Sequence, residues 1–189
     1  MNSKDYPFLD ELEAVGADAH IVAAYAQKLP VRLLEMAPYK CLNVHPSLLP
    51  GYRGAAPVTA AILNGDKESG VTIMKMAEQM DTGDILLQKK ITLNGNETTR
   101  SLELDLAELG GEMLLEVLEG LKEGKIVPLK QDDSRATYVR KISKEAGQID
   151  FSKSAEEIER QIRAYDPWPG SFTSLDGKTF KIWKAEALA

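Results

Sequence analysis

Short apolar runs alternate with helical segments along most of the chain, and this alternation limits the fold more than any other feature. Residues 21–25 are apolar without a polar alternation, which is typical of a strand that is buried on both faces, and residues 41–44 are expected to form a second strand. Residues 30–36 between them have the composition of a short helix, and residues 71–76 and 85–91 have that of two further strands. The pattern predicts an α/β fold with a mostly parallel sheet.

The longest periodic segment covers residues 98–122. Its apolar residues recur at helical spacing and would share one face, as Leu102, Leu106, Leu109, Met113, Leu114, Val117 and Leu121 do. A second helix is expected from Ser154 to about Ala164, because Ser154 and Glu157 form a capping-box pattern. These helices would supply the layers that cover the sheet.

A turn-rich stretch separates this part of the chain from its last residues. Residues 171–175 and 179–183 flank an Asp-Gly pair, which is a strong hairpin signal, and an Asp-Pro-Trp-Pro-Gly segment precedes them. We therefore expect a catalytic core over residues 1–166 and a linker with the start of a second domain over residues 167–189.

Composition excludes several classes of protein. Cys41 is the only cysteine, so no internal disulfide can form, and the chain suits a reducing cytoplasm. Cys41, His20 and His45 are too few for a zinc cluster of Cys and His ligands, and we expect no metal. No apolar run approaches the length that crosses a bilayer, so no membrane partner is expected.

Charge is unevenly distributed. The net charge of −6 is unlike that of a nucleic-acid-binding protein, but residues 122–145 carry seven basic and four acidic side chains. Two interpretations of this stretch stay open, a solvated loop or a surface that faces phosphates, and the second involves Arg135, Arg140, Lys141 and Lys144.

The residues with the clearest chemical potential follow the second predicted strand. Asn43 and His45 are two positions apart, so they share a face at the carboxyl end of that strand, where ligands bind in parallel sheets. An Asn amide can donate to a developing oxyanion, and a His can move a proton near neutral pH. Asp81, in a glycine-containing turn, is a candidate partner for the imidazole, although spacing alone does not place it there.

A longer motif surrounds these residues and resembles the signature of the folate-dependent formyltransferases. It comprises Asn43-x-His45-x-Ser47-Leu48-Leu49-Pro50 and the following Tyr52-Arg53-Gly54-Ala55-Ala56-Pro57. The segments Gly65-Asp66, Gly70-Val71-Thr72 and Met80-Asp81-Thr82-Gly83-Asp84 continue the likeness, and the 36 residues from His45 to Asp81 match the family's spacing. The Arg-Gly-Ala-Ala-Pro and Asp-Pro-Trp-Pro segments most resemble the branch that formylates methionyl-tRNA.

The resemblance implies a Rossmann-like core followed by the start of a small, OB-like β-barrel domain. It implies transfer of a formyl group from 10-formyltetrahydrofolate to the α-amino group of initiator methionyl-tRNA, with Asn43, His45 and Asp81 as the catalytic residues. Asp81 would hold the imidazolium and raise its pKa. Folate contacts are implied for Ser47, Leu48, Leu49, Pro50, Tyr25, Ala26, Gln27, Leu29, Gln79 and Met80, and substrate contacts for Arg53 and Gly54.

The chain departs from the family at three points. Position 26 is Ala where relatives commonly have Gly, and position 28 is Lys where an apolar residue is expected. The family's first strands and most of its barrel have no counterpart here, so we expect the strand at residues 21–25 to be uncovered and to promote self-association. Three other functions stay open: an amino-sugar-nucleotide formyltransferase, a fragment that binds folate or RNA without catalysis, and a formyltetrahydrofolate hydrolase.

Overall fold

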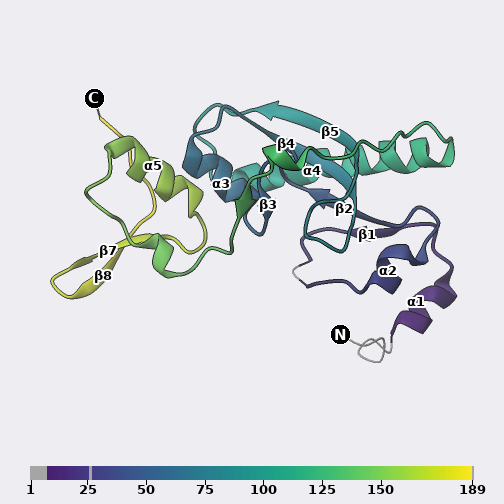
Figure 1. Cartoon of the computed structure of the whole chain (residues 1–189). Coiled ribbons are helices and arrows are strands. Elements are labelled where there is room, and N and C mark those ends of the chain that lie inside the picture. Colours follow the sequence, from purple (N-terminus) through teal and green to yellow (C-terminus); the bar gives the residue numbers. More distant parts are fainter. Residues whose placement is uncertain (1–7, 26, 189) are drawn as a thin grey trace.

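The computed structural model describes residues 8–25 and 27–188. Its helices and strands, shown in Figure 1, are α1 (Leu9–Val15), β1 (His20–Val22), α2 (Val31–Met36), β2 (Cys41–His45), β3 (Arg53–Gly54), α3 (Pro57–Asn64), β4 (Glu68–Lys75), β5 (Ile85–Thr92), α4 (Thr99–Lys122), β6 (Tyr138–Val139), α5 (Ala155–Ala164), β7 (Ser171–Leu175) and β8 (Lys178–Ile182). The predicted alternation of strands and helices is therefore confirmed. No described helix is long and apolar enough to cross a membrane.

The main sheet has the strand order β1-β2-β4-β5 and is mixed. β1 and β2 are parallel, whereas β2 with β4 and β4 with β5 are antiparallel. The prediction of a mostly parallel sheet is thus wrong for the described residues. Parallel neighbours need a crossover of a dozen or more residues, and residues 76–84 between β4 and β5 are too few for one. The alternation of elements predicts their type, but it does not fix the direction in which each strand returns.

β1 is shorter than predicted. It covers only His20–Val22, and Ile21 is exposed, which agrees with the expectation that this apolar strand is uncovered although its composition is typical of burial on both faces. The reason is its place in the sheet, since β1 is an edge strand among the described residues and pairs only with β2. An apolar run indicates that a strand tolerates burial, but not that neighbouring elements cover it.

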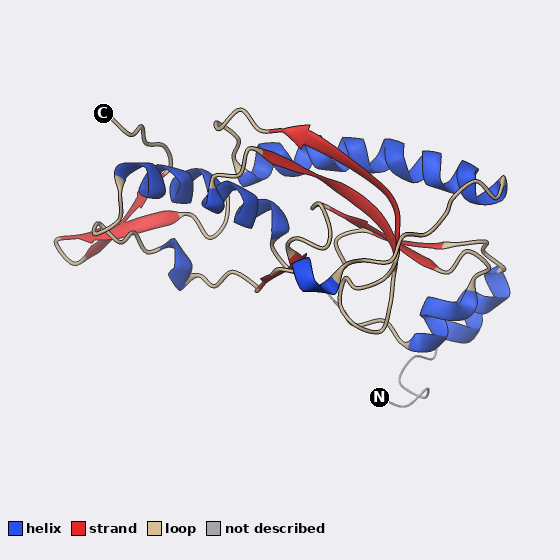
Figure 2. Cartoon of the chain, turned by 45° about the horizontal axis from the view of Figure 1, so that its top comes forward, coloured by secondary structure: helices blue, strands red, loops and turns tan. Residues whose placement is uncertain are grey.

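Helices lie on both faces of the sheet (Figure 2). Because side chains alternate along a strand, Leu42 of β2 packs into the main core against α4, and Cys41 packs against Leu33 and Leu34 of α2. The side chain of Thr98 accepts a hydrogen bond from the backbone of Ser101 and caps α4. The apolar face predicted for this helix is confirmed, with four residues fully buried and the rest partly buried: Leu102, Leu106, Met113, Val117, Leu109, Leu114 and Leu121.

The last part of the chain lies at the far end of the molecule from α1 (Figure 1). α5 begins with the predicted capping box of Ser154 and Glu157 and packs against α3. β7 and β8 form the predicted hairpin, and both residues of its turn, Asp176 and Gly177, have positive φ, as a tight hairpin turn requires. Among the described residues this hairpin is a separate two-stranded sheet.

A short strand pair connects two segments that are distant in the sequence. β3 pairs in parallel with β6, so Arg53 lies beside Tyr138 and Gly54 beside Val139. This pairing brings the segment after α4 against the loop that follows β2. Residues of the basic stretch at 122–145 therefore contribute to the surroundings of His45.

Candidate active site

β2 presents two polar side chains on the face opposite α4. Leu42 and Val44 pack into the core beneath α4, so the alternating residues Asn43 and His45 point the other way. Asn43 is half-buried, and its amide makes no hydrogen bond to a described residue. His45 is 4% exposed. The strand thus holds an amide without a hydrogen-bond partner among the described residues, beside a buried imidazole.

Both nitrogens of the His45 ring face oxygen atoms. Nε2 lies 3.1 Å from the carbonyl oxygen of Tyr52, which accepts only, so Nε2 carries the hydrogen. Nδ1 lies 3.9 Å from Oδ2 of Asp81. That distance is too long for a direct hydrogen bond, so the carboxylate acts on Nδ1 through its charge or through a bridging water.

The pKa of His45 is lowered from its ordinary value. Burial is the main cause, since it disfavours the charged ring, while the charge of Asp81 and the hydrogen bond to Tyr52 raise the pKa by less. Asp81 thus raises the pKa of His45 as expected, but burial lowers this pKa by more. The neutral ring is therefore favoured at neutral pH, with Asp81 ready to stabilise it when it accepts a proton.

Asp81 is placed beside His45 by its own turn and by a backbone donor. Gly54 N–H donates to Oδ2 of Asp81 at 2.7 Å, and Asp81 has a φ of 55°. Gly83 closes the turn against β4, where a Cβ would lie 1.8 Å from the carbonyl oxygen of Lys75. Only a glycine fits at that contact, so Gly83 is what allows this turn to approach the end of the sheet.

Tyr52 fixes the oxygen that faces His45. Its backbone has a φ of 57°, and its N–H donates to Oγ1 of Thr137 at 2.8 Å. Its hydroxyl donates to Asp66 at 2.6 Å and accepts from Asn64 at 2.8 Å. These three contacts hold both ends of the residue, so its carbonyl is kept in place although the backbone conformation is unusual for a residue with a Cβ.

Arg53, for which a substrate contact was expected, lies inside the protein. Its side chain is 1% exposed, and its guanidinium donates to Gln131 (3.1 and 2.7 Å), Asp133 (2.7 Å) and the hydroxyl of Tyr138 (3.1 Å). Gly54 likewise uses its N–H on Asp81. In this structure both residues make their polar contacts within the protein.

Gln131 is a residue that the sequence did not single out. It bonds to Arg53 and also donates to the carbonyl oxygens of Asp81 (2.9 Å) and Gly83 (2.7 Å). No local pattern points to it, because it follows Asp81 by 50 residues and stands in a stretch of mixed charge. Its only distinguishing feature in the sequence is its place in the basic segment, which suggests exposure to solvent or contact with phosphate and not a buried position.

Residues 47–50 follow His45 directly and combine buried and half-buried positions. The hydroxyl of Ser47 donates to the carbonyl of Gly51 at 2.7 Å. The N–H of Leu49 donates to Thr72, and Leu49 is buried. Leu48 and Pro50 are half-buried. The polar groups of Ser47 and Leu49 thus shape this loop, and its contact with folate stays a prediction.

The remaining folate candidates lie on two other loops. Tyr25 is 52% exposed, Gln27 is exposed and Leu29 is buried, while Ala26 lies outside the described residues. Gln79 and Met80 are exposed in the connection between β4 and β5. Lys28 stands where the family is expected to have an apolar residue, and it forms an ion pair. Its ammonium lies 3.7 Å from the carboxylate of Glu78 and connects the two loops.

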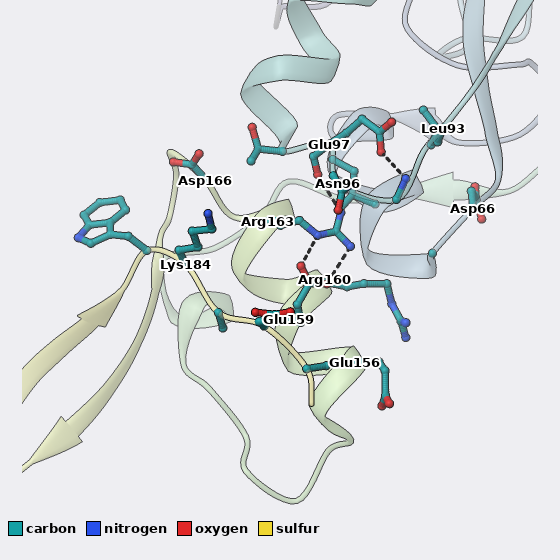
Figure 3. A pocket seen from close by; sticks show the side chains of 18 of the residues that line it. Asp66, Leu93, Asn96, Glu97, Glu156, Glu159, Arg160, Arg163, Asp166 and Lys184 are labelled. Atoms are coloured by element: carbon teal, nitrogen blue, oxygen red, sulfur yellow. Dashed lines mark hydrogen bonds and ion pairs between the residues drawn. The ribbon is translucent and has the colours of Figure 1, made fainter. Parts of the chain in front are cut away.

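A groove with a volume of about 910 Å³ lies elsewhere and is shown in Figure 3. It is lined by α5, the loop before α4, the end of α3 and the chain after β8. Arg163 bonds there to Glu159 on its own helix and to the carbonyl of Glu97. This charge is already paired within the protein, and none of the three catalytic candidates lines the groove. No three His, Cys, Asp or Glu side chains of the described residues gather as metal ligands do.

Comparison with known proteins identifies relatives for nearly all of the chain. The family described as Formyl transferase matches residues 2–118, and that described as Formyl transferase, C-terminal domain, matches residues 141–189. A curated methionyl-tRNA formyltransferase from Lachnospira eligens is 49% identical over 184 residues, which are 97% of this chain and 58% of that protein. The chain therefore spans less than two thirds of the length of this relative.

Solved structures show the same fold. HypX from Aquifex aeolicus in complex with tetrahydrofolic acid matches 90% of this chain and 30% of its own, with a TM-score of 0.79 and 24% identity. The N-formyltransferase from Helicobacter canadensis in complex with folinic acid and dTDP-3-aminofucose matches 85% of this chain and 58% of its own, with a TM-score of 0.70 and 28% identity. These matches establish a Rossmann-like fold with a mixed sheet.

Proposed function

Because the chain belongs to the formyl transferase family, we propose that it transfers a formyl group from 10-formyltetrahydrofolate to the α-amino group of initiator methionyl-tRNA. The observation that carries the proposal is the placement of Asn43, His45 and Asp81 at the end of β2, with the Asn43 amide making no hydrogen bond to a described residue and the imidazole lying between two oxygen atoms. The 49% identity with a methionyl-tRNA formyltransferase favours this acceptor over others.

The chemistry requires a new bond from the amine nitrogen to the formyl carbon and cleavage of the bond from that carbon to N10. When bound, 10-formyltetrahydrofolate supplies the activated formyl carbon. Asn43 would donate to the formyl oxygen as this oxygen gains negative charge, and a donor of this kind contributes about 3 kcal/mol. Its amide is suited to this because it makes no hydrogen bond to a described residue.

His45 would move the proton. The attacking amine loses one proton and the departing N10 gains one, so a single group that accepts and then returns a proton balances the reaction. Burial keeps the ring neutral and able to accept, and Asp81 stabilises the charged ring near Nδ1. No covalent bond to the protein is needed.

We propose that the folate lies between the loop after β2 and the two exposed loops joined by Lys28 and Glu78. The exposed side chains of Tyr25, Gln27 and Met80 support this location, because they are available to a ligand. The other contacts inferred from the family, including Ser47, Leu49 and Leu29, would shape the loops from inside.

We also propose the finer organisation of the chain. The core would end near Pro167, and the β7–β8 hairpin would begin a small β-barrel. The edge of β1 would pair with a second chain, since an uncovered apolar strand edge is a template for pairing. The tRNA would contact the basic stretch through Arg135, Arg140, Lys141 and Lys144, and neutralising all four should flatten the salt dependence of tRNA binding.

The test is formyl transfer from 10-formyltetrahydrofolate, with methionyl-tRNA, an amino-sugar nucleotide and water as separate acceptors. Formylated methionyl-tRNA supports the proposal. Formylated sugar nucleotide would assign the chain to the amino-sugar enzymes, and tetrahydrofolate released without an amine would indicate a hydrolase. A folded chain that binds folate without transfer would indicate a binding fragment. Circular dichroism of each sample establishes that the chain is folded.

A further inference from the structure

Gln131 lies at the centre of a buried hydrogen-bond network that ends at Asp81. Its side chain is 6% exposed. The amide nitrogen donates to the carbonyl oxygens of Asp81 at 2.9 Å and Gly83 at 2.7 Å. The amide oxygen accepts from Nε of Arg53 at 3.1 Å and from Nη2 at 2.7 Å. The amide therefore uses both of its donors and both of its acceptor sites.

The orientation of this amide is determined by its partners. Both backbone carbonyls on one side accept only, and the guanidinium on the other side donates only, so the amide fits in one orientation. Asp133 and Tyr138 in turn hold the guanidinium. A side chain with every polar group satisfied and only one fitting orientation fixes the position of whatever it bonds.

The network reaches Asp81 from two directions. Gln131 holds its backbone carbonyl, and Gly54, the residue after Arg53, donates its N–H to the carboxylate at 2.7 Å. Asp81 needs such support, because its φ of 55° is uncommon for a residue with a Cβ. The carboxylate stands 3.9 Å from His45, where a small displacement changes its effect on the ring.

We propose that Gln131, oriented by Arg53, is a positioning residue that sets the place of Asp81 beside His45 for formyl transfer. This proposal rests on the proposed function for the catalytic role of His45. The NMR test of the proposal does not depend on that function. The proposal also explains why Arg53 is buried: its guanidinium orients the amide that holds the turn of Asp81.

The test follows His45 by nitrogen-15 NMR, in the full chain carrying His20→Gln so that His45 gives the only histidine signals. Gln131→Met keeps the length of the side chain and removes both donors and the acceptor. Asp81 is the charged side chain that raises the pKa of His45, so its displacement should lower the titration midpoint of His45. In the formylation assay kcat should fall about 10-fold to 100-fold, with the folate KM unchanged.

Gln161→Met is the matched control. Gln161 is 4% exposed, and its amide nitrogen donates to the carbonyls of residues 146–148, which make no hydrogen bond to His45, Tyr52 or Asp81 among the described residues. The control should lose a similar amount of stability and leave the His45 signals unchanged. If Gln131→Met fails to fold, Gln131→Asn tests the same point, because the shorter amide cannot reach both sides.

Two results would overturn the proposal. One is a folded Gln131 variant whose His45 signals and midpoint equal those of the parent chain. The other is an equal shift in the Gln161 control, which would mean a general structural effect. Absence of formyl transfer in the parent chain would remove the proposed function instead, since the NMR measurement does not depend on activity.

Discussion

The two sides of the candidate site differ in how they are held. On the catalytic side, hydrogen bonds with Gly54, Gln131 and Thr137 fix Asp81 and the backbone of Tyr52. On the side proposed for folate, Tyr25, Gln79 and Met80 are exposed, and an ion pair between two exposed side chains connects their loops. The surroundings of His45 are thus fixed by buried contacts, whereas the loops proposed to face the ligand are open.

This difference separates two kinds of mutational effect. Changes in the buried network should alter the chemical step or the stability, because each change would leave a buried polar group without its hydrogen-bond partner. Changes in the exposed loops should alter folate binding alone, because few contacts within the protein depend on them. The predictions below test that separation.

The largest effect is expected for His45→Ala. Removal of the group proposed to move the proton should lower kcat for formyl transfer by about 10²-fold to 10⁴-fold, with a small change in the folate KM. Met80→Ala on the exposed loop is the matched comparison and should raise KM with kcat nearly unchanged. Steady-state kinetics of both variants check this. Equal losses in both constants for both variants would remove the distinction between the two sides.

The next effect is on stability, for Arg53→Met. The acceptor oxygen of Gln131 then loses both of its donors while buried, so the free energy of unfolding should fall by about 1–3 kcal/mol. Lys90→Met is the control, since Lys90 pairs with Glu68 where both side chains are exposed, and it should change stability by less than about 0.5 kcal/mol. Urea denaturation measures both. Similar values for the two variants would mean that the Arg53 network contributes no more than a surface ion pair.

The sequence was sufficient for features that depend on local periodicity. The period of two along β2 places Asn43 and His45 on one face, and the capping box of Ser154 and Glu157 begins α5 where expected. The helix at 98–122 and the final hairpin were also predicted, because each has its own start or turn signal. In each of these features, the contacts that determine the structure join residues only a few positions apart in the sequence.

The remainder depends on contacts between distant segments. The antiparallel return of β4 and the exposure of β1 follow from which strands are neighbours. The burial of Arg53 depends on Gln131, which is 78 residues away, and such a pair leaves no local signal. For the same reason, the sequence suggested Asp81 as the partner of His45 but did not determine the 3.9 Å between Nδ1 of His45 and Oδ2 of Asp81.

A smaller effect is expected in the pH dependence of stability. The folded-state pKa of His45 lies below its ordinary value of about 6.5, so the unfolded chain binds a proton in a range where the folded chain does not. This contribution to stability is therefore present above about pH 6.5 and is lost as the pH falls below it, by at most about 1.4 kcal/mol per pH unit. Urea denaturation at pH 7.5 and 5.5 should show a smaller loss in His45→Gln than in the parent chain. An identical loss in both would contradict the burial of a neutral ring, and His20→Gln serves as the control.

The smallest effect is expected for Lys28→Ala, which tests the exposed side of the comparison. Lys28 and Glu78 form an exposed ion pair, and such pairs contribute at most about 1 kcal/mol, so unfolding should change little. Because the pair connects the two proposed folate loops, the folate KM should rise by less than about fivefold, and the change should shrink at high salt. The measurement is the KM for 10-formyltetrahydrofolate at two ionic strengths, with Lys90→Ala as the control for loss of a surface charge. A large, salt-independent rise in KM would mean that Lys28 acts on the folate itself, and the exposed loops would then be as specifically built as the buried network.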